Sequence, residues 1–338
     1  MKDYSAVITK SKVPPYRSGI VSPTLRLTKV KKTIKPKDLN LFHAPCDKIY
    51  LQGNGSLDIR ELEKFKSTQP IGFLRGYSSF TSFRFHIMGA DLFYYQNPRS
   101  FQLQLNPSQF RSYSALNEVL KIFLKEKFNE VRIFKLHLFT DIRQRLVDVE
   151  KSITVSFKRK TSKYKPAERR TAKSGATNEI SFTLGIGSEN LDCIKIYNST
   201  TKHGLPDPST RIERQFSKAR VCPITKLSDL HLLSKYNPFT NVHLNKVIDS
   251  SKLTGIHLVR YKLLNCLCNK KTLHESMAEL RKDNPKHFVR DYRRVLELLR
   301  RTDFDLFADY QKKWKTYFKR RLTKKEIDTL RLIGGADV

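Results

Sequence analysis

Cys193-Ile194-Lys195-Ile196-Tyr197 is a strand-like run, and polar residues follow it directly, from Asn198 to Lys202. Side chains on a strand alternate between two faces, so the run predicts a strand that ends at a tyrosine. A second alternating run follows, Arg211-Ile212-Glu213-Arg214-Gln215. It places Arg211, Glu213 and Gln215 on one face. A phenol at this position is a candidate nucleophile.

A third strand is predicted upstream, at Lys135-Leu136-His137-Leu138-Phe139-Thr140-Asp141-Ile142. Its alternation sets Lys135, His137, Phe139 and Asp141 on one face. His137 and Asp141 are four residues apart, roughly 13 Å along an extended strand, so both cannot bind one ion unless the strand bends. We expect one of them to bind metal and the other to face DNA or to support the site.

The strands belong to an α+β pattern of antiparallel sheet and helices. Short apolar and aromatic strands begin near residue 79, and residues 101–105 (FQLQL) alternate cleanly before an Asn-Pro-Ser turn. Ser114 is the expected N-cap of a helix bearing Leu116, Val119, Leu120, Phe123 and Leu124. Strands resume at residues 179–186, 191–197 and 210–216. We therefore predict an α+β fold of antiparallel sheet with helices, followed by a helical C-terminal domain.

Three domains are expected along the chain. Residues 1–74 read as a basic arm or small subdomain, residues 75–225 as the catalytic domain, and residues 226–338 as a helical, basic DNA-binding domain. Residues 157–173 carry eight cations against one acid and predict a mobile basic loop. The helical domain is plainest after Asn284-Pro285, where Phe288, Tyr292, Val295, Leu296 and Leu299 recur at helical spacing.

The charge of the chain favours a nucleic-acid partner. Lys and Arg number 65 against 32 Asp and Glu, a formal net charge of +33, and the cations are spread over the whole length. No segment reaches the roughly 18 apolar residues of a membrane span, and no signal peptide is visible, so a cytoplasmic protein without a membrane partner is expected. The five cysteines form neither a disulfide framework nor a zinc pattern.

Four motifs in order resemble the replication-initiation proteins of rolling-circle plasmids and filamentous phages, over about residues 75–220. They are Asn106-Pro107-Ser108-Gln109-Phe110, the strand from Lys135 to Asp141, the pair of Thr183-Leu184 with Ile194-Lys195-Ile196-Tyr197-Asn198, and Arg211-Ile212-Glu213. The chain departs from the family pattern at His137, where an Asp is usual. It also lacks the family's Lys after the Tyr-Asp pair, which is a possible phosphate contact. Lys202 could supply that contact instead.

The resemblance implies a metal-dependent nicking and rejoining endonuclease. Tyr197 would attack one origin strand, hold its 5′ phosphate covalently and leave a 3′-hydroxyl primer. A phenol has an unperturbed pKa of about 10, so a cation must assist it, and Glu213, Asp141 and His137 are the candidate ligands of Mg²⁺ or Mn²⁺. The partners implied are double-stranded origin DNA, single-stranded DNA, and a host helicase and polymerase; a dimer is left open.

The expected DNA contacts are cations from all three regions of the chain. They are Lys135, Lys195, Lys202, Arg211, Lys158, Arg159, Lys160, Arg169, Arg170, Arg290, Arg293 and Arg294.

Simpler interpretations stand beside each role. Tyr197 could be an ordinary strand aromatic, Glu213 a salt-bridged surface acid, His137 a half-buried core histidine and Asp141 a turn residue. The alternative function is a sequence-specific DNA-binding protein, an initiator or repressor, in which the same fold has lost its chemistry.

Overall fold

The computed structural model describes residues 44–65, 71–75, 78–155, 164–171, 180–186, 192–199, 207–240, 242–269, 271–302 and 305–334. A ten-stranded sheet dominates them, with strand order β2-β3-β4-β5-β1-β6-β11-β10-β9-β8 and antiparallel pairing throughout. The strands are β1 (Cys46–Asn54), β2 (Ile71–Arg75), β3 (Ser78–Ile87), β4 (Ala90–Gln96), β5 (Ser100–Leu105), β6 (Arg132–Ile142), β8 (Tyr164–Thr171), β9 (Ile180–Ile186), β10 (Asp192–Asn198) and β11 (Thr210–Phe216). The expected α+β class with an antiparallel sheet is confirmed.

Strand β1 lies at the centre of the sheet although it comes first in the described chain. It pairs with β5 on one side and β6 on the other. Residues 46–54 therefore belong to the same sheet as β6, β10 and β11, and the boundary expected at residue 75 differs from the structure.

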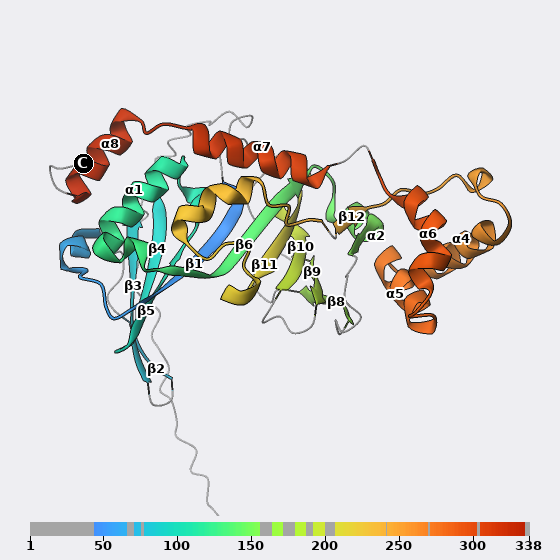
Figure 1. Cartoon of the computed structure of the whole chain (residues 1–338), viewed down its shortest axis with the longest axis horizontal. Helices are drawn as coiled ribbons and strands as arrows, with labels where there is room; N and C mark the ends of the chain where they lie inside the picture. The colour runs from blue at the N-terminus through green and yellow to red at the C-terminus, as the bar shows by residue number, and fades with distance from the viewer. Residues whose placement is uncertain are drawn as a thin grey trace, which may run out of the picture. The chain divides into compact units, whose positions relative to one another are not determined.

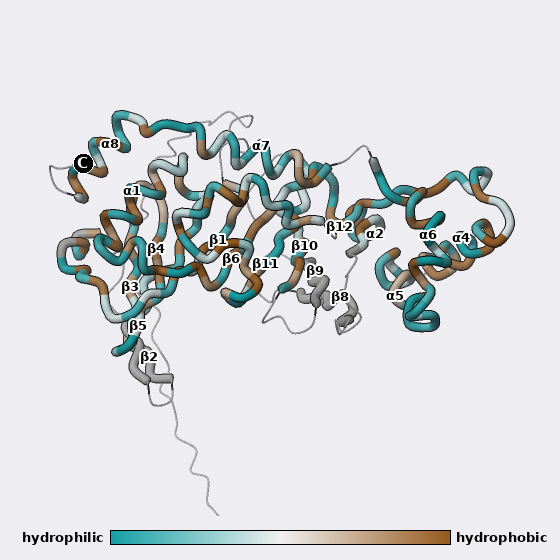
Figure 2. Tube along the Cα trace, in the orientation of Figure 1, coloured by the Kyte–Doolittle hydropathy of each residue, from teal (hydrophilic) through white to brown (hydrophobic). Residues whose placement is uncertain are grey.

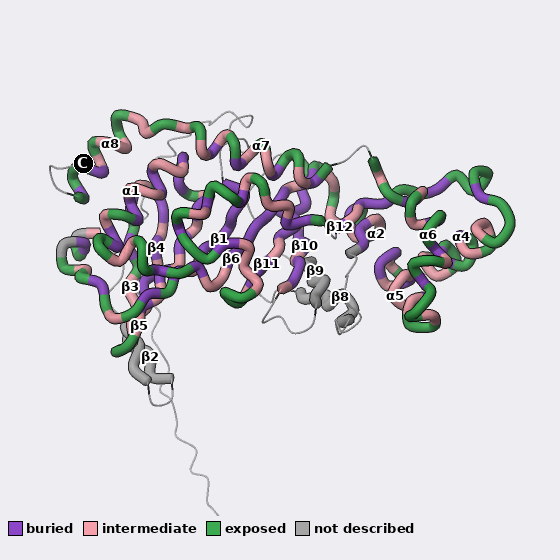
Figure 3. Tube along the Cα trace, in the orientation of Figure 1, coloured by how far each residue is buried: buried purple, intermediate pink, exposed green. Residues whose placement is uncertain are grey.

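Helices cover the apolar face of the central strands (Figure 1). α1 (Tyr113–Leu124) and α7 (Leu306–Lys319) supply buried side chains to this core, and Tyr310, Trp314 and Tyr317 of α7 are almost fully buried in it. α8 (Lys324–Gly334) contributes Leu330 and Ile333. Figures 2 and 3 show the result: hydrophobic, buried segments run along β1, β6 and β11.

The N-cap of α1 differs from the expected residue. Ser112 rather than Ser114 caps the helix, because its side chain accepts a hydrogen bond from the Ala115 N–H at 3.2 Å. The expected helical face is confirmed, since Leu116, Val119, Leu120, Phe123 and Leu124 are all buried.

Three helices have a core of their own. α4 (Gly255–Cys268), α5 (Leu273–Asp283) and α6 (Phe288–Leu299) bury a cluster that runs from Ile248 to Leu299. The chain enters and leaves this three-helix unit side by side: Asn245 and Arg300 form an isolated bridge, and Lys246 N–H donates to the Leu299 carbonyl at 2.8 Å. The helical region expected over residues 226–338 is thus divided, because α7 and α8 return to the core of the sheet.

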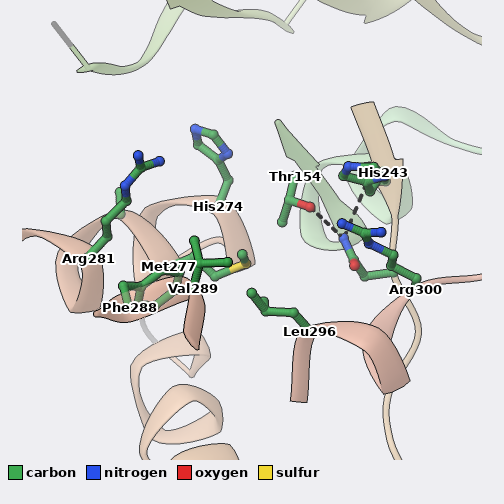
Figure 4. A pocket seen from close by; sticks show the side chains of 11 residues that line it. Thr154, His243, His274, Met277, Arg281, Phe288, Val289, Leu296 and Arg300 are labelled. Carbon is green, nitrogen blue, oxygen red and sulfur yellow. Dashed lines mark hydrogen bonds between the residues drawn. The ribbon is translucent and has the colours of Figure 1, made fainter. Parts of the chain in front are cut away.

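A small two-stranded sheet precedes the three-helix unit. It pairs β7 (Ile153–Val155), which follows α2 (Leu146–Ser152), with β12 (Val242–Leu244). Between this sheet and helices α5 and α6 lies a cavity of about 90 Å³ (Figure 4), lined by Thr154 and His243 on one side and by His274, Met277 and Phe288 on the other.

The basic segment expected as a loop is partly a strand. Residues 164–171 form β8, which pairs with β9 at the end of the sheet. Lys158, Arg159 and Lys160 lie outside the described residues, so their expected role stays a prediction. All five cysteines are free thiols, and Cys46 and Cys193 are buried. None of the described helices combines the length and hydrophobicity needed to cross a bilayer.

Candidate active site on the central strands

Four neighbouring strands each place one chemically active side chain at the same spot. β1, β6, β11 and β10 are consecutive in the sheet and carry Asp47, His137, Glu213 and Tyr197 respectively. Glu213 lies opposite Phe139 of β6 and opposite Lys195 of β10. Because paired residues and residues two apart share a face, His137, Glu213 and Tyr197 all lie on the face opposite the apolar core.

Asp47 reaches this face through a β-bulge. Cys46 pairs with Leu138 and Lys48 pairs with His137, so two steps along β1 match one step along β6 and Asp47 is the extra residue. A bulge re-aims a side chain that strict alternation would send elsewhere. The bulge thus adds Asp47 as a third candidate ligand beside His137 and Glu213.

The carboxylates of Asp47 and Glu213 and the imidazole of His137 form a buried trio whose ligand atoms all lie within 4.8 Å of one another. His137 Nδ1 is 2.9 Å from Glu213 Oε1. Gln215 Nε2 donates to the same oxygen at 2.5 Å. These four residues are each 8% exposed or less. Such a set of oxygens and one imidazole nitrogen suits a divalent cation.

The electrostatics of the trio also suit a cation. Burial works against the Glu213 carboxylate, but the hydrogen bonds and charge it meets at His137, with help from Gln215 and Tyr197, lower its pKa to about 2. Burial lowers the pKa of His137 and outweighs the neighbouring Glu213, which favours a neutral ring. Glu213 is therefore ionised and His137 neutral near pH 7, the protonation states that metal ligands need.

Two observations support the fit to a metal ion. His137 Nε2 is buried and has no hydrogen-bond partner among the described residues, a condition that costs free energy unless something else satisfies the atom. The Nδ1 atom of the same ring lies 2.9 Å from Glu213 Oε1, and a carboxylate at that nitrogen orients the imidazole so that Nε2 is the atom left to bind a cation. We conclude that the trio is a candidate site for a divalent metal.

Tyr197 is bound directly to the trio. Its hydroxyl donates to Glu213 Oε2 at 2.9 Å, and 8% of the residue is exposed. Burial, and then the negative charge of Glu213, raise the pKa of Tyr197 well above its usual value. The phenol is therefore protonated at rest, and its hydrogen bond fixes the direction of the oxygen.

Asp141 and Arg211, both expected at the site, bind each other instead. Arg211 donates to the two Asp141 oxygens at 2.8 and 3.1 Å, and its guanidinium lies 3.6 Å from the centre of the Phe139 ring. Asp47 is 3.9 Å from the same guanidinium. Asp141 lies outside the metal-ligand trio, and Arg211 is 7% exposed. The two residues form a buried ion pair because the register places them opposite each other; a metal ligand at Asp141 and a DNA contact at Arg211 stay predictions.

A cluster of three lysines lies next to the trio on the same face: Lys48, Lys135 and Lys195. Lys48 pairs with His137, and Lys195 pairs with Glu213. The Lys135 ammonium lies 4.8 Å from the ring centre of Tyr50, its partner across β1 and β6. Burial lowers the pKa of Lys135, and the positive charges of Lys195 and Lys48 lower it further. Lys135 and Lys195 are thus kept as candidate phosphate contacts.

The other expected DNA contacts are spread more widely. Lys202 lies outside the described residues, and Arg169 and Arg170 lie in β8, where only the backbone is described. Arg290, Arg293 and Arg294 are exposed on α6; Arg290 and Arg293 contact Asp291 and Glu297 in ion pairs whose cations stay over 70% exposed.

Sequence reasoning missed Asp47, Lys48 and Tyr50, since it treated the first 74 residues as an arm. The signal was present: Ile49 and Leu51 alternate with polar neighbours in CDKIYLQ, as in the other strands. The bulge that turns Asp47 toward the site leaves no mark of its own in the sequence.

Neither a protein-family model nor a curated protein matches the chain. Among solved structures, one similar chain is titled "Structure of Rolling Circle Replication Initiator Protein from Geobacillus stearothermophilus"; it is 13% identical, with a TM-score of 0.35, over 68% of this chain and 97% of that one.

Proposed function

We propose that the protein is a metal-dependent DNA nicking and rejoining enzyme that initiates rolling-circle replication, with Tyr197 as its nucleophile. One observation carries the proposal: the Tyr197 hydroxyl donates a 2.9 Å hydrogen bond to Glu213, which belongs to a buried trio fit for a divalent cation. Any buried tyrosine hydroxyl needs an acceptor, but here the acceptor is itself one of the three candidate metal ligands. Mg²⁺ or Mn²⁺ is the proposed ion, held by Asp47, His137 and Glu213.

The reaction is an exchange of one phosphodiester for another. The Tyr197 oxygen attacks the scissile phosphorus, the bond from phosphorus to the 3′ oxygen breaks, and the phenolic proton is transferred to that oxygen. The products are a 5′-phosphotyrosine link and a free 3′-hydroxyl. Because a phosphate ester bond is conserved, the 3′-hydroxyl can attack in turn, rejoin the strand and release Tyr197.

Each residue of the site has its own proposed role in the reaction. Glu213 accepts the hydrogen bond that orients the Tyr197 hydroxyl, and it is ionised, so it can also hold the cation. Gln215 donates a hydrogen bond to the Glu213 carboxylate and so fixes its orientation. The Arg211–Asp141 ion pair supports the neighbouring surface of the sheet. When bound, the cation supplies positive charge that stabilises the phosphate as negative charge develops.

DNA binding follows from the charge of the chain and the lysines of the site. With a net charge of +33, the protein is expected to bind both the origin duplex and the locally melted strand in the cytoplasm. A host helicase and polymerase would then extend from the 3′-hydroxyl. The alternative of a DNA-binding protein without chemistry accounts for the charge, but it gives no role to the buried trio of candidate metal ligands beside Tyr197.

The test is to incubate the purified protein with supercoiled DNA carrying its own origin and either Mn²⁺ or Mg²⁺. We expect relaxed circles, a free 3′-hydroxyl and protein attached to the 5′ end, all dependent on the metal. Tight binding without any strand break would favour the non-catalytic alternative.

A further inference from the structure

The cluster of Lys48, Lys135 and Lys195 is not used by the chemistry proposed above. Three ammonium groups from three strands face one region of the sheet, yet none of them forms an ion pair with a carboxylate in the described part of the chain. Like charges held together repel one another, and Lys135 is also partly buried. A protein maintains such a cluster at a cost in stability unless an anion binds there.

A ring contact and the strand register determine where the three lysines of the cluster lie. Lys135 lies against the face of the Tyr50 ring, 4.8 Å from its centre, and that ring also lies 5.8 Å from the His137 ring. A cation over an aromatic face is attracted by it and loses freedom of movement. Lys48 and Lys195 are fixed by their strands directly opposite His137 and Glu213. The register therefore places all three lysines beside the metal-ligand trio on one face of the sheet.

The position of the cluster sets which part of a DNA strand it meets. Lys195 precedes Tyr197 by two residues on β10, about 6.6 Å along the strand, and His137 with Lys48 lies a further pair along the sheet from Glu213. Along the strand direction, Tyr197 is thus at one end of the site, Lys195 is level with Glu213, and Lys48 and Lys135 lie at the other end. In phosphoryl transfer, attack and departure occur on opposite sides of phosphorus. With Tyr197 attacking, the departing 3′ oxygen and its strand point toward the lysines.

We infer that Lys48, Lys135 and Lys195 bind the backbone phosphate next to the scissile one on the strand that ends in the 3′-hydroxyl. The inference rests on the proposed function and adds a direction to it. The lysines hold the cleaved end in place, so that the 3′-hydroxyl stays positioned for rejoining. Tyr197 holds the other end covalently.

The first arm of the test needs no nicking. A K48Q/K135Q/K195Q variant is compared with K226Q/K235Q/K246Q, which removes the same charge at exposed positions away from the site. Binding of a fluorescent oligothymidylate is measured over a series of NaCl concentrations, with Tyr197→Phe in every variant to exclude covalent attachment. Loss of the contact to this one phosphate should lower the slope of log K against log salt by about 0.7 in the first variant. A slope equal to that of the control would overturn the inference.

The second arm tests the direction. Nick-site oligonucleotides carry one uncharged methylphosphonate, either one phosphate to the 5′ side of the scissile position or one to its 3′ side. The 5′-side substitution should weaken binding at least tenfold in the Tyr197→Phe protein and have no further effect once the three lysines are replaced. Coupling to the 3′-side phosphate, or to neither, would contradict the inference even if nicking itself is verified. Absence of nicking with an altered salt slope would instead reject the proposed function and leave the phosphate contact standing.

Discussion

The Tyr197 hydroxyl and the Glu213 carboxylate are joined by a 2.9 Å hydrogen bond across adjacent strands, although the residues are 16 positions apart in the sequence. The bond brings a nucleophile to the edge of a buried trio of Asp47, His137 and Glu213. Nearly every property proposed for this protein depends on that contact. We assign Tyr197 and the trio to the chemistry, and the Arg211–Asp141 pair to support of the sheet.

Replacement of the trio should remove metal binding. Asp47→Asn and Glu213→Gln each exchange a charged ligand for a neutral one of the same shape, and we expect Mn²⁺ affinity measured by isothermal titration calorimetry to fall by roughly tenfold or more. Asp141→Asn is the matched control, because Asp141 is bound to Arg211 and lies outside the trio. Equal losses in Asp141→Asn and Asp47→Asn would show that the ligands have been assigned wrongly.

Arg211 should matter for stability more than for DNA affinity. Its side chain is 9% exposed and pairs with Asp141, so Arg211→Ala removes both short hydrogen bonds to a largely buried carboxylate and leaves it, among the described residues, only Lys313, 3.9 Å away. We expect a loss of about 3–5 kcal/mol in the free energy of unfolding, measured with urea. A loss below about 1 kcal/mol, the size typical of a surface ion pair, would mean that the pair is solvated and that Arg211 is available to DNA.

Acid should destabilise the three-helix unit through His274. Burial lowers the pKa of His274 to about 4, from an ordinary value near 6.5, with Glu275 opposing. A depressed pKa means that the folded state resists protonation, so its contribution to stability is complete above about pH 6.5 and is lost as the pH falls toward 4. The loss from this residue is on the order of 3 kcal/mol.

The measurement compares urea unfolding of the wild type and His274→Gln between pH 7 and pH 4. We expect the substitution to flatten the dependence of stability on pH. Part of the slope should remain, because His243 lines the same cavity and its pKa is also lowered, by burial and then by Arg300. Parallel curves for the two proteins would show that His274 takes up protons equally in the folded and unfolded states.

Removal of the three-helix unit should separate duplex binding from cleavage. Asn245 and Arg300 are bridged, so residues 247–298 can be replaced by an Asn-Gly turn without moving the ends. The variant should fold, cleave a single-stranded nick-site oligonucleotide and lose roughly tenfold or more in affinity for the origin duplex. Truncation from residue 270 is unsuitable, since it removes Trp314 and Tyr317 from the main core.

Two controls complete this experiment. Replacing exposed Arg290, Arg293 and Arg294 with Gln should reproduce part of the duplex defect with every helix in place. If the excised variant loses oligonucleotide cleavage and duplex binding to the same extent, while circular dichroism reports an intact fold, the division of labour is wrong.

Alternation within strands made much of the site predictable. The shared face of His137, Phe139 and Asp141, and that of Arg211, Glu213 and Gln215, follow from the pleat alone, and the register confirms both. The α6 face was equally predictable, because Phe288, Tyr292, Val295 and Leu299 recur at helical spacing and are buried.

What could not be predicted depends on contacts between distant segments. The pairing of Arg211 with Asp141 requires the register of β11 against β6, which neither strand encodes by itself. Asp47 requires both the insertion of β1 between β5 and β6 and a local bulge. The strand at residues 164–171 has a composition with low β propensity, and only its partner β9 makes it a strand.

The direct test of the central proposal is the chemical identity of the protein–DNA link. Wild-type protein and Tyr197→Phe are incubated with origin DNA and Mn²⁺, the covalent complex is digested, and the modified peptide is sequenced by mass spectrometry. Since the substitution removes only the nucleophilic oxygen, Tyr197→Phe should bind the duplex nearly as well as the wild type and form no adduct, and the wild-type peptide should carry a 5′-nucleotide on Tyr197. An adduct in Tyr197→Phe, or a nucleotide on another residue of the wild type, would contradict the account.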